Sequence, residues 1–333
     1  MAEALGWPYD IKDLDYRRVA STLSLFRMRT RQGIHRVGSA KLKPPWPDLV
    51  ISAGMRNEPV CRWIRKQSGG RTRIIIIGRP WTPLERFDLV ITTPQYRLPD
   101  RPNVLQNSLT MQGVTMERLQ VEADRWESRF RDLPRPWTAV IVGGSSGPYT
   151  FGRKAARRLA AQATAFARER GGSLLVTTSA RTAPAALQEL SRRIAAPAWF
   201  YHWQQDDLNN PYYAYLGLAD ELIVTADSIS MLSEACATRK PVHMFDLGSG
   251  RHSMGQATAS GDNDVRLSAM IYRVLMRWGP LRLSRDITLV HDQLIREGRA
   301  DWLGQSDSAS APLPLQDIDR AVARVRALLA GAG

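Results

Sequence analysis

Short apolar runs of four or five residues recur along the chain, and most precede a longer segment with apolar residues at helical spacing. The clearest case lies in residues 221–245. Leu222 to Thr225 is uncharged and rich in β-branched residues, as expected for a strand buried on both faces of a parallel sheet. From Met231 to Cys236 the apolar residues follow helical spacing, and Val242 to Phe245 is another apolar run. The pattern predicts strand, loop, helix and strand in succession.

The same alternation predicts two rounds of strand and helix on either side of a proline-marked junction at residues 133–136. Strands are expected at 48–52, 73–77, 88–91, 139–142, 174–177 and 198–202, and helices at 59–66, 117–130, 153–170, 184–194, 265–278 and 315–329. This order predicts an α/β protein with two Rossmann-like domains that face each other across a cleft. The expected domains are 1–134 and 135–264, followed by a helical segment, 265–333, that packs back on them.

The net charge of the 333 residues is +14, and arginine supplies 40 of the 46 basic side chains. Residues 1–134 contain 23 basic and 14 acidic residues, so the first domain is the more basic one. A basic surface suits an anionic lipid surface or a phosphorylated substrate, although a merely solvated arginine-rich surface explains it as well. No nucleic-acid-binding motif is present, so no nucleic-acid partner is expected.

Two cysteines lie far apart in sequence, at Cys61 and Cys236, and neither has a neighbouring metal ligand. Buried free thiols in a reducing cytoplasm are the simplest interpretation, and no metal site is expected. No apolar run approaches the ~18 residues of a membrane-spanning helix, and the polar, charged start does not resemble a signal peptide. The expected location is cytoplasmic, with peripheral attachment at the inner membrane face as a further possibility.

Polar residues follow the predicted strand at 222–225 directly. Asp227, Ser228 and Ser230 are helix-capping types, and they stand where a parallel strand ends and a helix begins. A helix start carries a partial positive charge and unpaired N–H groups, which suits a diphosphate. Glu234 would face the same crevice one turn into the helix. The alternative is an ordinary strand-cap-helix unit that binds nothing.

Further polar residues follow the other predicted strands, and ligands of such sheets bind at these carboxyl ends. The loops of the second domain contribute Gly143, Gly144, Ser145, Ser146, Thr178, Ser179 and Arg181. The loops of the first domain contribute Ser52, Gly54, Arg56, Thr93, Gln95 and Tyr96. In each loop, the glycines and hydroxyls could equally serve only to shape a turn.

Six segments together resemble one known family. SAGMRNEPVCRWIR, FDLVITTPQYRLPDRPNV, VIVGGSSGPY, LLVTTSARTAP, NNPYYAYLGLAD and VTADSISMLSEACATRKPV occur in this order. They are similar to the elongated-mitochondria (mitochondrial fission) family, which has bacterial and plant members and is grouped with the two-domain GT-B glycosyltransferases. The resemblance spans residues 48–247. It implies that the 228–230 segment lies near the diphosphate of a nucleotide-sugar and that Glu234 lies near its ribose. It also implies that the loop residues of the second domain lie on the donor side and those of the first domain on the acceptor side.

The chain departs from the family pattern in two places. The family opens with an additional strand and a glycine-containing loop, whereas this sequence starts at MAEALG. We therefore expect a first domain that lacks this strand and is damaged at its cleft, since an unpaired sheet edge exposes N–H and C=O groups. The loop GSGRHSMGQATASGDNDV is also longer than the family pattern.

Glycosyl transfer requires that a leaving diphosphate be neutralised and an acceptor hydroxyl deprotonated. Arg181 and the backbone N–H groups of residues 143–146 are candidates for the first task and need no metal. Glu58 and His202 are candidates for the base, although both could be structural. Two functions therefore stand: nucleotide-sugar-dependent transfer to an envelope or lipid-linked acceptor, or a non-catalytic adaptor that binds a protein partner. No permanently bound cofactor is expected in either.

Overall fold

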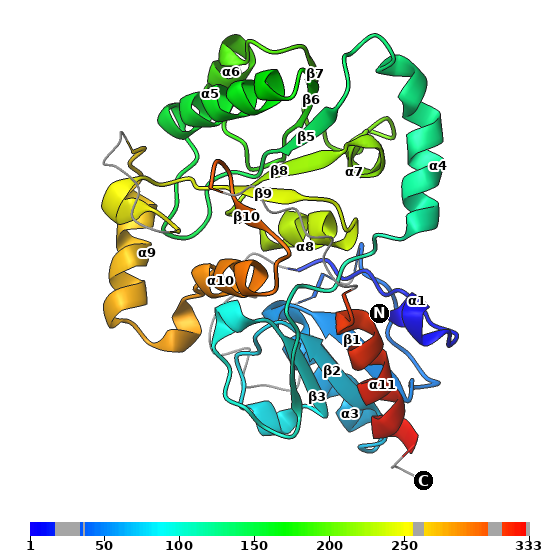
Figure 1. Cartoon of the computed structure of the whole chain (residues 1–333). Coiled ribbons are helices and arrows are strands. Elements are labelled where there is room, and N and C mark those ends of the chain that lie inside the picture. The colour runs from blue at the N-terminus through cyan, green and yellow to red at the C-terminus, as the bar shows by residue number, and fades with distance from the viewer. Residues whose placement is uncertain (17–33, 36, 256–262, 306–314, 331–333) are drawn as a thin grey trace. The chain divides into compact units, whose positions relative to one another are not determined.

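The computed structural model describes residues 1–16, 34–35, 37–255, 263–305 and 315–330 (Figure 1). The chain forms two compact units. The first contains Met1–Ser108 together with the C-terminal segment from Gln316, and the second contains Leu109–Leu315. The boundary therefore lies at residue 108, not at the predicted residue 134.

The reason for the shifted boundary is the packing of helix α4 (Met116–Trp126) along α7 (Tyr212–Leu218). Gly217 allows the close approach, because a Cβ there would lie 2.7 Å from the carbonyl oxygen of Leu119. Phe130 then stacks on Trp126 at 6.1 Å and meets Trp137 edge-on at 6.0 Å. These contacts tie the segment to the second core, so the prolines at 134 and 136 mark a loop inside that unit.

The first unit has a four-stranded parallel sheet in the order β1-β2-β3-β4. Its strands are β1 (Leu49–Ala53), β2 (Arg73–Ile77), β3 (Leu89–Thr92) and β4 (Val104–Gln106). Helix α3 (Glu58–Gln67) connects β1 to β2 and buries Val60, Cys61 and Ile64. Both cysteines are free and buried, as expected.

The last helix, α11 (Asp317–Ala330), belongs to the first unit. The Asp317 carboxylate accepts a hydrogen bond from the Ser108 backbone N–H at 3.1 Å, and Arg326 donates to the Leu5 carbonyl oxygen at 3.2 Å. Leu5 is the last residue of α1 (Ala2–Leu5). The predicted helical segment 265–333 is therefore divided: its start belongs to the second unit and its end to the first.

The second unit has a six-stranded parallel sheet in the order β10-β9-β8-β5-β6-β7. Its strands are β5 (Trp137–Ile141), β6 (Ser173–Thr177), β7 (Ala198–Tyr201), β8 (Glu221–Thr225), β9 (Val242–Phe245) and β10 (Asp301–Trp302). Counted from β5, this is the doubly wound order 6-5-4-1-2-3, and the predicted parallel α/β fold is confirmed.

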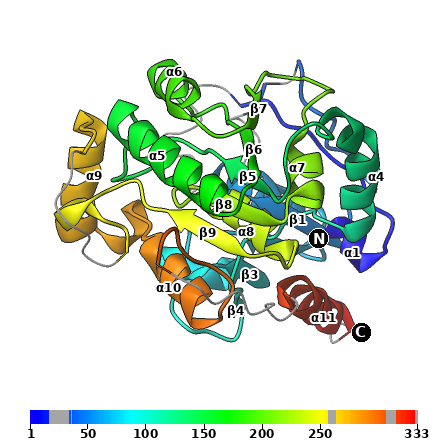
Figure 2. The same ribbon diagram turned by 45° about the horizontal axis from the view of Figure 1, so that its top comes forward.

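The helices of this sheet lie on both of its faces (Figures 1 and 2). Right-handed crossovers that reverse direction at β5 place α5 (Arg153–Glu169) and α6 (Pro184–Arg193) on one face. They place α8 (Ile229–Ala237) on the other. Two further helices, α9 (Leu267–Trp278) and α10 (Thr288–Arg296), follow β9.

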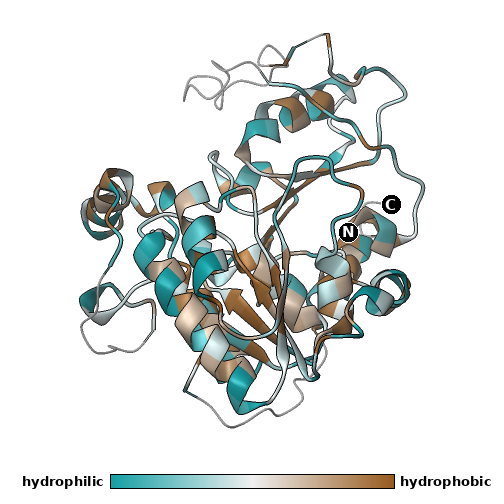
Figure 3. Ribbon diagram, turned by 90° about the horizontal axis from the view of Figure 1, so that it is seen from above, coloured by the Kyte–Doolittle hydropathy of each residue, from teal (hydrophilic) through white to brown (hydrophobic). Residues whose placement is uncertain are grey.

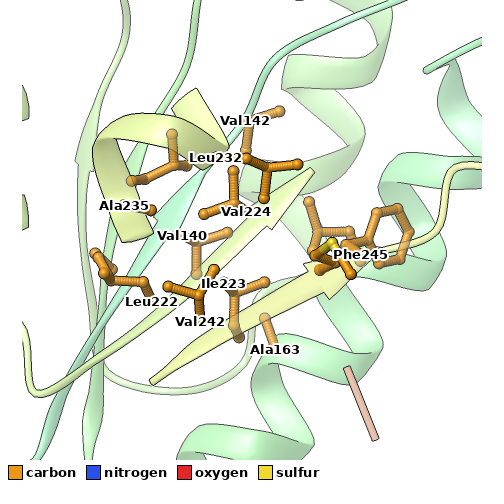
Figure 4. Close-up of a cluster of buried hydrophobic side chains, with 14 of the residues drawn as sticks. Val140, Val142, Ala163, Leu222, Ile223, Val224, Leu232, Ala235, Val242 and Phe245 are labelled. Atoms are coloured by element: carbon orange, nitrogen blue, oxygen red, sulfur yellow. The ribbon is translucent and has the colours of Figure 1, made fainter. Parts of the chain in front are cut away.

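The core of the second unit lies between these layers. Val140, Ile223 and Val224 are fully buried, and Figure 4 shows them between α8 and the helices of the opposite face. Several strands are strongly apolar along their length (Figure 3). The uncharged run that predicts a doubly buried strand at 222–225 is thus confirmed as β8.

Candidate functional site

The loops after β5 and β8 lie beside each other in the second unit. These strands pair directly, with Ala139 opposite Leu222 and Ile141 opposite Val224. The direction of the connections reverses between them, which makes this the topological switch point of the sheet. Ligands of doubly wound sheets bind outside the carboxyl ends at this point. The structure therefore brings Gly143, Gly144 and Asp227 together at the place where a ligand crevice is expected.

Asp227 is the centre of this cluster. Its side chain is fully buried, and its carboxylate accepts hydrogen bonds from the Gly144 N–H at 3.0 Å and the Thr225 hydroxyl at 2.8 Å. An Arg181 N–H lies 3.0 Å from the same carboxylate, while the Arg181 side chain remains 42% exposed. Burial raises the pKa of the Asp227 carboxyl, and Arg181, Thr225 and Gly144 act in the opposite direction. The loop after β6 is thus tied to the loop after β8 through one charge pair.

The glycine turn directs its amides into the protein. Gly143 donates to the Thr225 hydroxyl at 2.7 Å, Gly144 donates to Asp227, and Ser146 donates to the Tyr149 carbonyl oxygen at 3.0 Å. These three N–H groups, expected from the sequence to face a diphosphate, are therefore used internally in this structure. Glycine is needed because a Cβ at 143 would lie 2.5 Å from Asp227 Oδ1, and a Cβ at 144 would lie 2.2 Å from the Arg181 carbonyl oxygen.

Ser179 and Thr182 connect the turn to the loop after β6. Both hydroxyls donate to the Gly143 carbonyl oxygen, at 2.8 and 2.5 Å. Thr182 and Thr225 were not identified from the sequence, where the only signal for Thr225 is a polar residue at the end of an apolar strand.

Three other predicted hydroxyls serve neighbouring loops. Ser145 accepts from the Phe151 N–H at 3.0 Å, and Ser146 accepts from the Arg285 guanidinium at 2.7 Å. Thr178 accepts from the Trp203 N–H at 3.0 Å, at the end of β7. These contacts order the loops that follow β5 and β6.

Helix α8 begins directly after the β8 loop that contains Asp227. Ser228 occupies the N-cap position, but its side chain makes no capping hydrogen bond within the described residues. Ser228 is buried and Ser230 is exposed. The first-turn N–H groups of a helix have no intrahelical acceptor and carry the positive end of its dipole. The start of α8 is therefore a suitable place for an anion.

Helix α5 begins differently. The Asp264 carboxylate accepts hydrogen bonds from the N–H groups of Gly152, Lys154 and Ala155, at 3.0, 3.1 and 2.8 Å. A carboxylate from a distant loop therefore caps this helix start and compensates its dipole. Asp264 was not identified from the sequence, because 109 or more residues separate it from its donors.

Glu234 lies in the middle of α8 and turns toward the start of α7. Its carboxylate accepts from the Tyr212 hydroxyl at 2.5 Å, and Arg118 lies over the Tyr213 ring at 3.5 Å. Burial raises the pKa of the Glu234 carboxyl, whereas Tyr212 and Arg118 lower it. The structure thus places Glu234 in a polar cluster of α4, α7 and α8. Its predicted contact with a ribose stays a prediction.

The two candidate bases have different surroundings. Glu58 is fully buried and accepts hydrogen bonds from the Trp81 N–H at 2.5 Å and from the Thr82 N–H and hydroxyl at 3.1 and 2.9 Å. Burial raises the pKa of its carboxyl, and these donors oppose the rise. Three donors from one loop explain Glu58 as a structural carboxylate. His202 is exposed beside Phe200 at the end of β7, an outer strand of the sheet. A catalytic role for either stays a prediction.

The predicted acceptor-side residues all lie in the first unit, within β1 or in the loops after β1 and β3. Ser52 is a buried residue of β1, Gly54 has a φ of 80°, and Arg56 is exposed. The Gln95 amide donates to the Thr93 hydroxyl at 3.0 Å, and both side chains are buried. The Tyr96 carbonyl oxygen accepts from Arg79. The loops after these two strands are thus ordered by their own contacts.

The described residue ranges were searched for metal-ligand clusters and membrane spans. They contain no group of three or more histidine, cysteine, aspartate or glutamate side chains that could hold a metal ion. No helix within them is both long and apolar enough to cross a membrane. Residues 21–31, whose basic sequence with interleaved apolar residues predicts an amphipathic peripheral segment, lie outside these ranges.

Comparison with known proteins identifies relatives. A family model described as "Mitochondrial fission ELM1" matches residues 1–262. The mitochondrial fission protein ELM1 of Arabidopsis thaliana is 25% identical over 235 residues, which are 64% of this chain and 55% of the relative. An uncharacterised protein of Rickettsia prowazekii is 22% identical over 231 residues, which are 60% of this chain and 64% of the relative. The chain thus spans little more than half to just under two thirds of these relatives.

Two solved structures are similar to this chain at low sequence identity. One is a glycosyltransferase from Rickettsia africae, with a TM-score of 0.39 and 12% identity over 85% of this chain and 77% of that one. Another is MurG of Acinetobacter baumannii, with a TM-score of 0.35 and 12% identity over 84% of this chain and 74% of that one.

Proposed function

The chain belongs to the mitochondrial fission ELM1 family, and from this premise and the switch-point geometry we propose that its second unit binds a nucleotide-sugar. We propose further that the protein transfers the sugar to an envelope or lipid-linked acceptor at the inner face of a membrane. The observation that supports the proposal best is the position of the α8 start directly after β8, next to β5, where the sheet reverses direction. Doubly wound sheets of this order hold nucleotides at that place.

A leaving diphosphate carries negative charge that has to be stabilised as the glycosidic bond breaks. The first-turn N–H groups of α8 and its dipole provide such stabilisation without a metal. Arg181 would add a positive charge at the rim. Its guanidinium has five N–H donors, of which Asp227 uses at least one, and the side chain is partly exposed. Asp227 would then act by positioning Arg181 and the Gly144 turn.

Glu234 would recognise the ribose. A carboxylate can accept hydrogen bonds from two neighbouring hydroxyls, and Tyr212 already fixes the position of this one. Arg118 and Tyr213 border the same cluster. The base that deprotonates the acceptor stays open between Glu58 and His202.

The test is thermal unfolding of the full chain with UDP, GDP, ADP and CMP and their sugar conjugates. A ligand at 100 times its dissociation constant adds about 2.7 kcal/mol to the free energy of unfolding, which raises the midpoint by several degrees. We expect a shift with one base class that Glu234→Ala abolishes. Glu169→Ala, which removes an exposed carboxylate at the end of α5, is the matched control and should keep the shift.

A chain that responds to none of these nucleotides contradicts the proposal. The non-catalytic adaptor that binds a protein partner would then be the function to pursue, with pull-down as its assay. A shift that survives Glu234→Ala would keep the nucleotide site but reject the assigned role of Glu234.

A further inference from the structure

Helix α9 presents its apolar side chains to solvent. Leu267, Met270, Ile271, Val274 and Trp278 are 72, 50, 61, 61 and 78% exposed. Their spacing confines them to a stripe about 100° wide along one side of the helix. An ordinary surface helix has the opposite arrangement, with its apolar stripe toward the core. We call these five residues the α9 stripe.

The other side of α9 is anchored to the second unit. Ala269 is buried, and the Tyr272 hydroxyl accepts a hydrogen bond from the Arg285 N–H at 2.9 Å. Arg266 donates to the Gly147 carbonyl oxygen at 3.2 Å. The Tyr272 ring lies 3.2 Å from where a Cβ on Gly147 would stand. The helix therefore docks through its inner side and holds the stripe outward.

The surroundings of the stripe are apolar and basic. Val265, Leu281 and Leu283 extend the exposed apolar surface at both ends of the helix. Residues 265–285 contain five arginines and no aspartate or glutamate. Apolar side chains on one side of a helix with flanking arginines are typical of helices that lie in the interface of an anionic membrane.

We propose that the α9 stripe docks the protein on an anionic lipid bilayer, with the apolar side chains below the headgroups and Arg277 and Arg282 at the lipid phosphates. The helix has 12 residues and is about 18 Å long, too short to span a bilayer core of about 30 Å. It lies in the interface instead. The family match ends at residue 262, before this helix, and the proposal does not depend on nucleotide-sugar binding.

Charge complementarity favours lipid over a second copy of the chain. In a two-fold symmetric dimer through this surface, Arg277 and Arg282 would lie in the contact without an acidic partner in residues 265–285. An anionic bilayer supplies the opposite charge and the apolar phase together.

The experiment is flotation of the full chain with vesicles made of phosphatidylglycerol and phosphatidylcholine in equal parts, and with vesicles of phosphatidylcholine alone. Binding should be strong on the anionic vesicles and weaker on the neutral ones. It should fall with added salt, because the Debye length shortens from about 10 Å at 0.1 M to about 3 Å at 1 M.

Paired variants assign the surface. Ile271→Ser with Val274→Ser should lower binding to the anionic vesicles by at least about tenfold, because two aliphatic side chains that would be buried in the lipid are lost. Val121→Ser with Leu208→Ser removes two aliphatic side chains elsewhere in the second unit that are 61 and 88% exposed, and should leave binding unchanged. Arg277→Gln with Arg282→Gln should lower binding by roughly thirtyfold at low salt.

Trp278 gives a direct readout. Its fluorescence should shift to the blue on anionic vesicles, and the shift should disappear with Trp278→Phe. Equal binding of the stripe variant and its control would overturn the proposal. A second result would also overturn it: the protein does not float with the vesicles, and sedimentation velocity shows a dimer that the stripe variant dissociates. The stripe would then be an interface between two copies.

Discussion

The pair of Asp227 and Arg181 should respond unequally when its two members are changed. The Asp227 side chain is fully buried, whereas that of Arg181 is 42% exposed. Arg181→Gln leaves a buried carboxylate without its cation, and such losses cost about 3–5 kcal/mol of unfolding free energy. Gly144 and Thr225 still donate to the carboxylate, so we expect about 3 kcal/mol.

Asp227→Asn keeps the shape of the side chain and leaves a cation that can reach water. Its carboxamide oxygen can still accept from the Gly144 N–H, and its NH₂ group then faces the Thr225 hydroxyl. That hydroxyl already accepts from the Gly143 N–H, so it could also accept from the new donor but would lose the acceptor for its own proton. We expect a cost of about 1–2 kcal/mol. Adding Arg181→Gln to this variant should cost less than about 1 kcal/mol more.

The dependence on pH has a definite sign. Loss of Arg181 raises the pKa of the Asp227 carboxyl further above its ordinary value of 3.8. A carboxyl with a raised pKa in the folded state stabilises the fold below its unfolded pKa and loses this contribution as pH rises through the folded pKa. The penalty of Arg181→Gln relative to the wild type should therefore shrink as pH falls from about 7 to about 5.

Urea unfolding followed by circular dichroism at both pH values measures these differences, with m-values checked for constancy. Arg157→Gln is the control, since Arg157 is 53% exposed and its partner Glu189 keeps Arg193; a cost below about 1 kcal/mol is expected. Equal costs for Arg181→Gln and Asp227→Asn, or a penalty for Arg181→Gln that ignores pH, would refute the reasoning.

Three further predictions concern the same unit. Gly144→Ala should lower the free energy of unfolding by about 1–3 kcal/mol because its Cβ meets backbone, whereas Gly113→Ala, with open space around its Cβ, should be nearly neutral in the same urea titration. Burial lowers the pKa of His291 to about 4, so stability should fall by roughly 3 kcal/mol as pH drops from about 6.5 to about 4, and His291→Gln should flatten that part of the stability profile. Asp264→Ala uncaps α5 and should cost about 1–2 kcal/mol, and inorganic sulfate should raise the melting temperature of the variant more than that of the wild type.

The sheet of the second unit was predictable because its central strands are buried on both faces. Leu222 to Thr225 and Val242 to Phe245 are uninterrupted apolar or β-branched runs apart from His243, and both are strands. Strand β10 has only Asp301 and Trp302, too few residues for any periodic pattern. The domain boundary was misplaced because prolines report local chain geometry, whereas the packing of α4 on α7 is a long-range contact.

The site was predictable in part, for a similar reason. Asp227 and the glycine turn could be read as polar residues after apolar strands, and the fold brings them together. The direction of the Gly143 amide could not be read, because its acceptor on Thr225 is 82 residues away. Arg118 gave no signal at all, since its place beside Tyr213 depends on how α4 lies along α7.

The starts of α5 and α8, which both lie at the carboxyl end of the second sheet, differ in one respect that bears on where an anion can bind. At α5 the Asp264 carboxylate already occupies three N–H groups, so a phosphate there would have to displace a negative charge held by short hydrogen bonds. At α8 Ser228 makes no side-chain cap within the described residues. An anion at α8 would therefore not have to displace a side-chain cap. For this reason we place the proposed diphosphate at α8, and the sulfate response of Asp264→Ala separates the two sites.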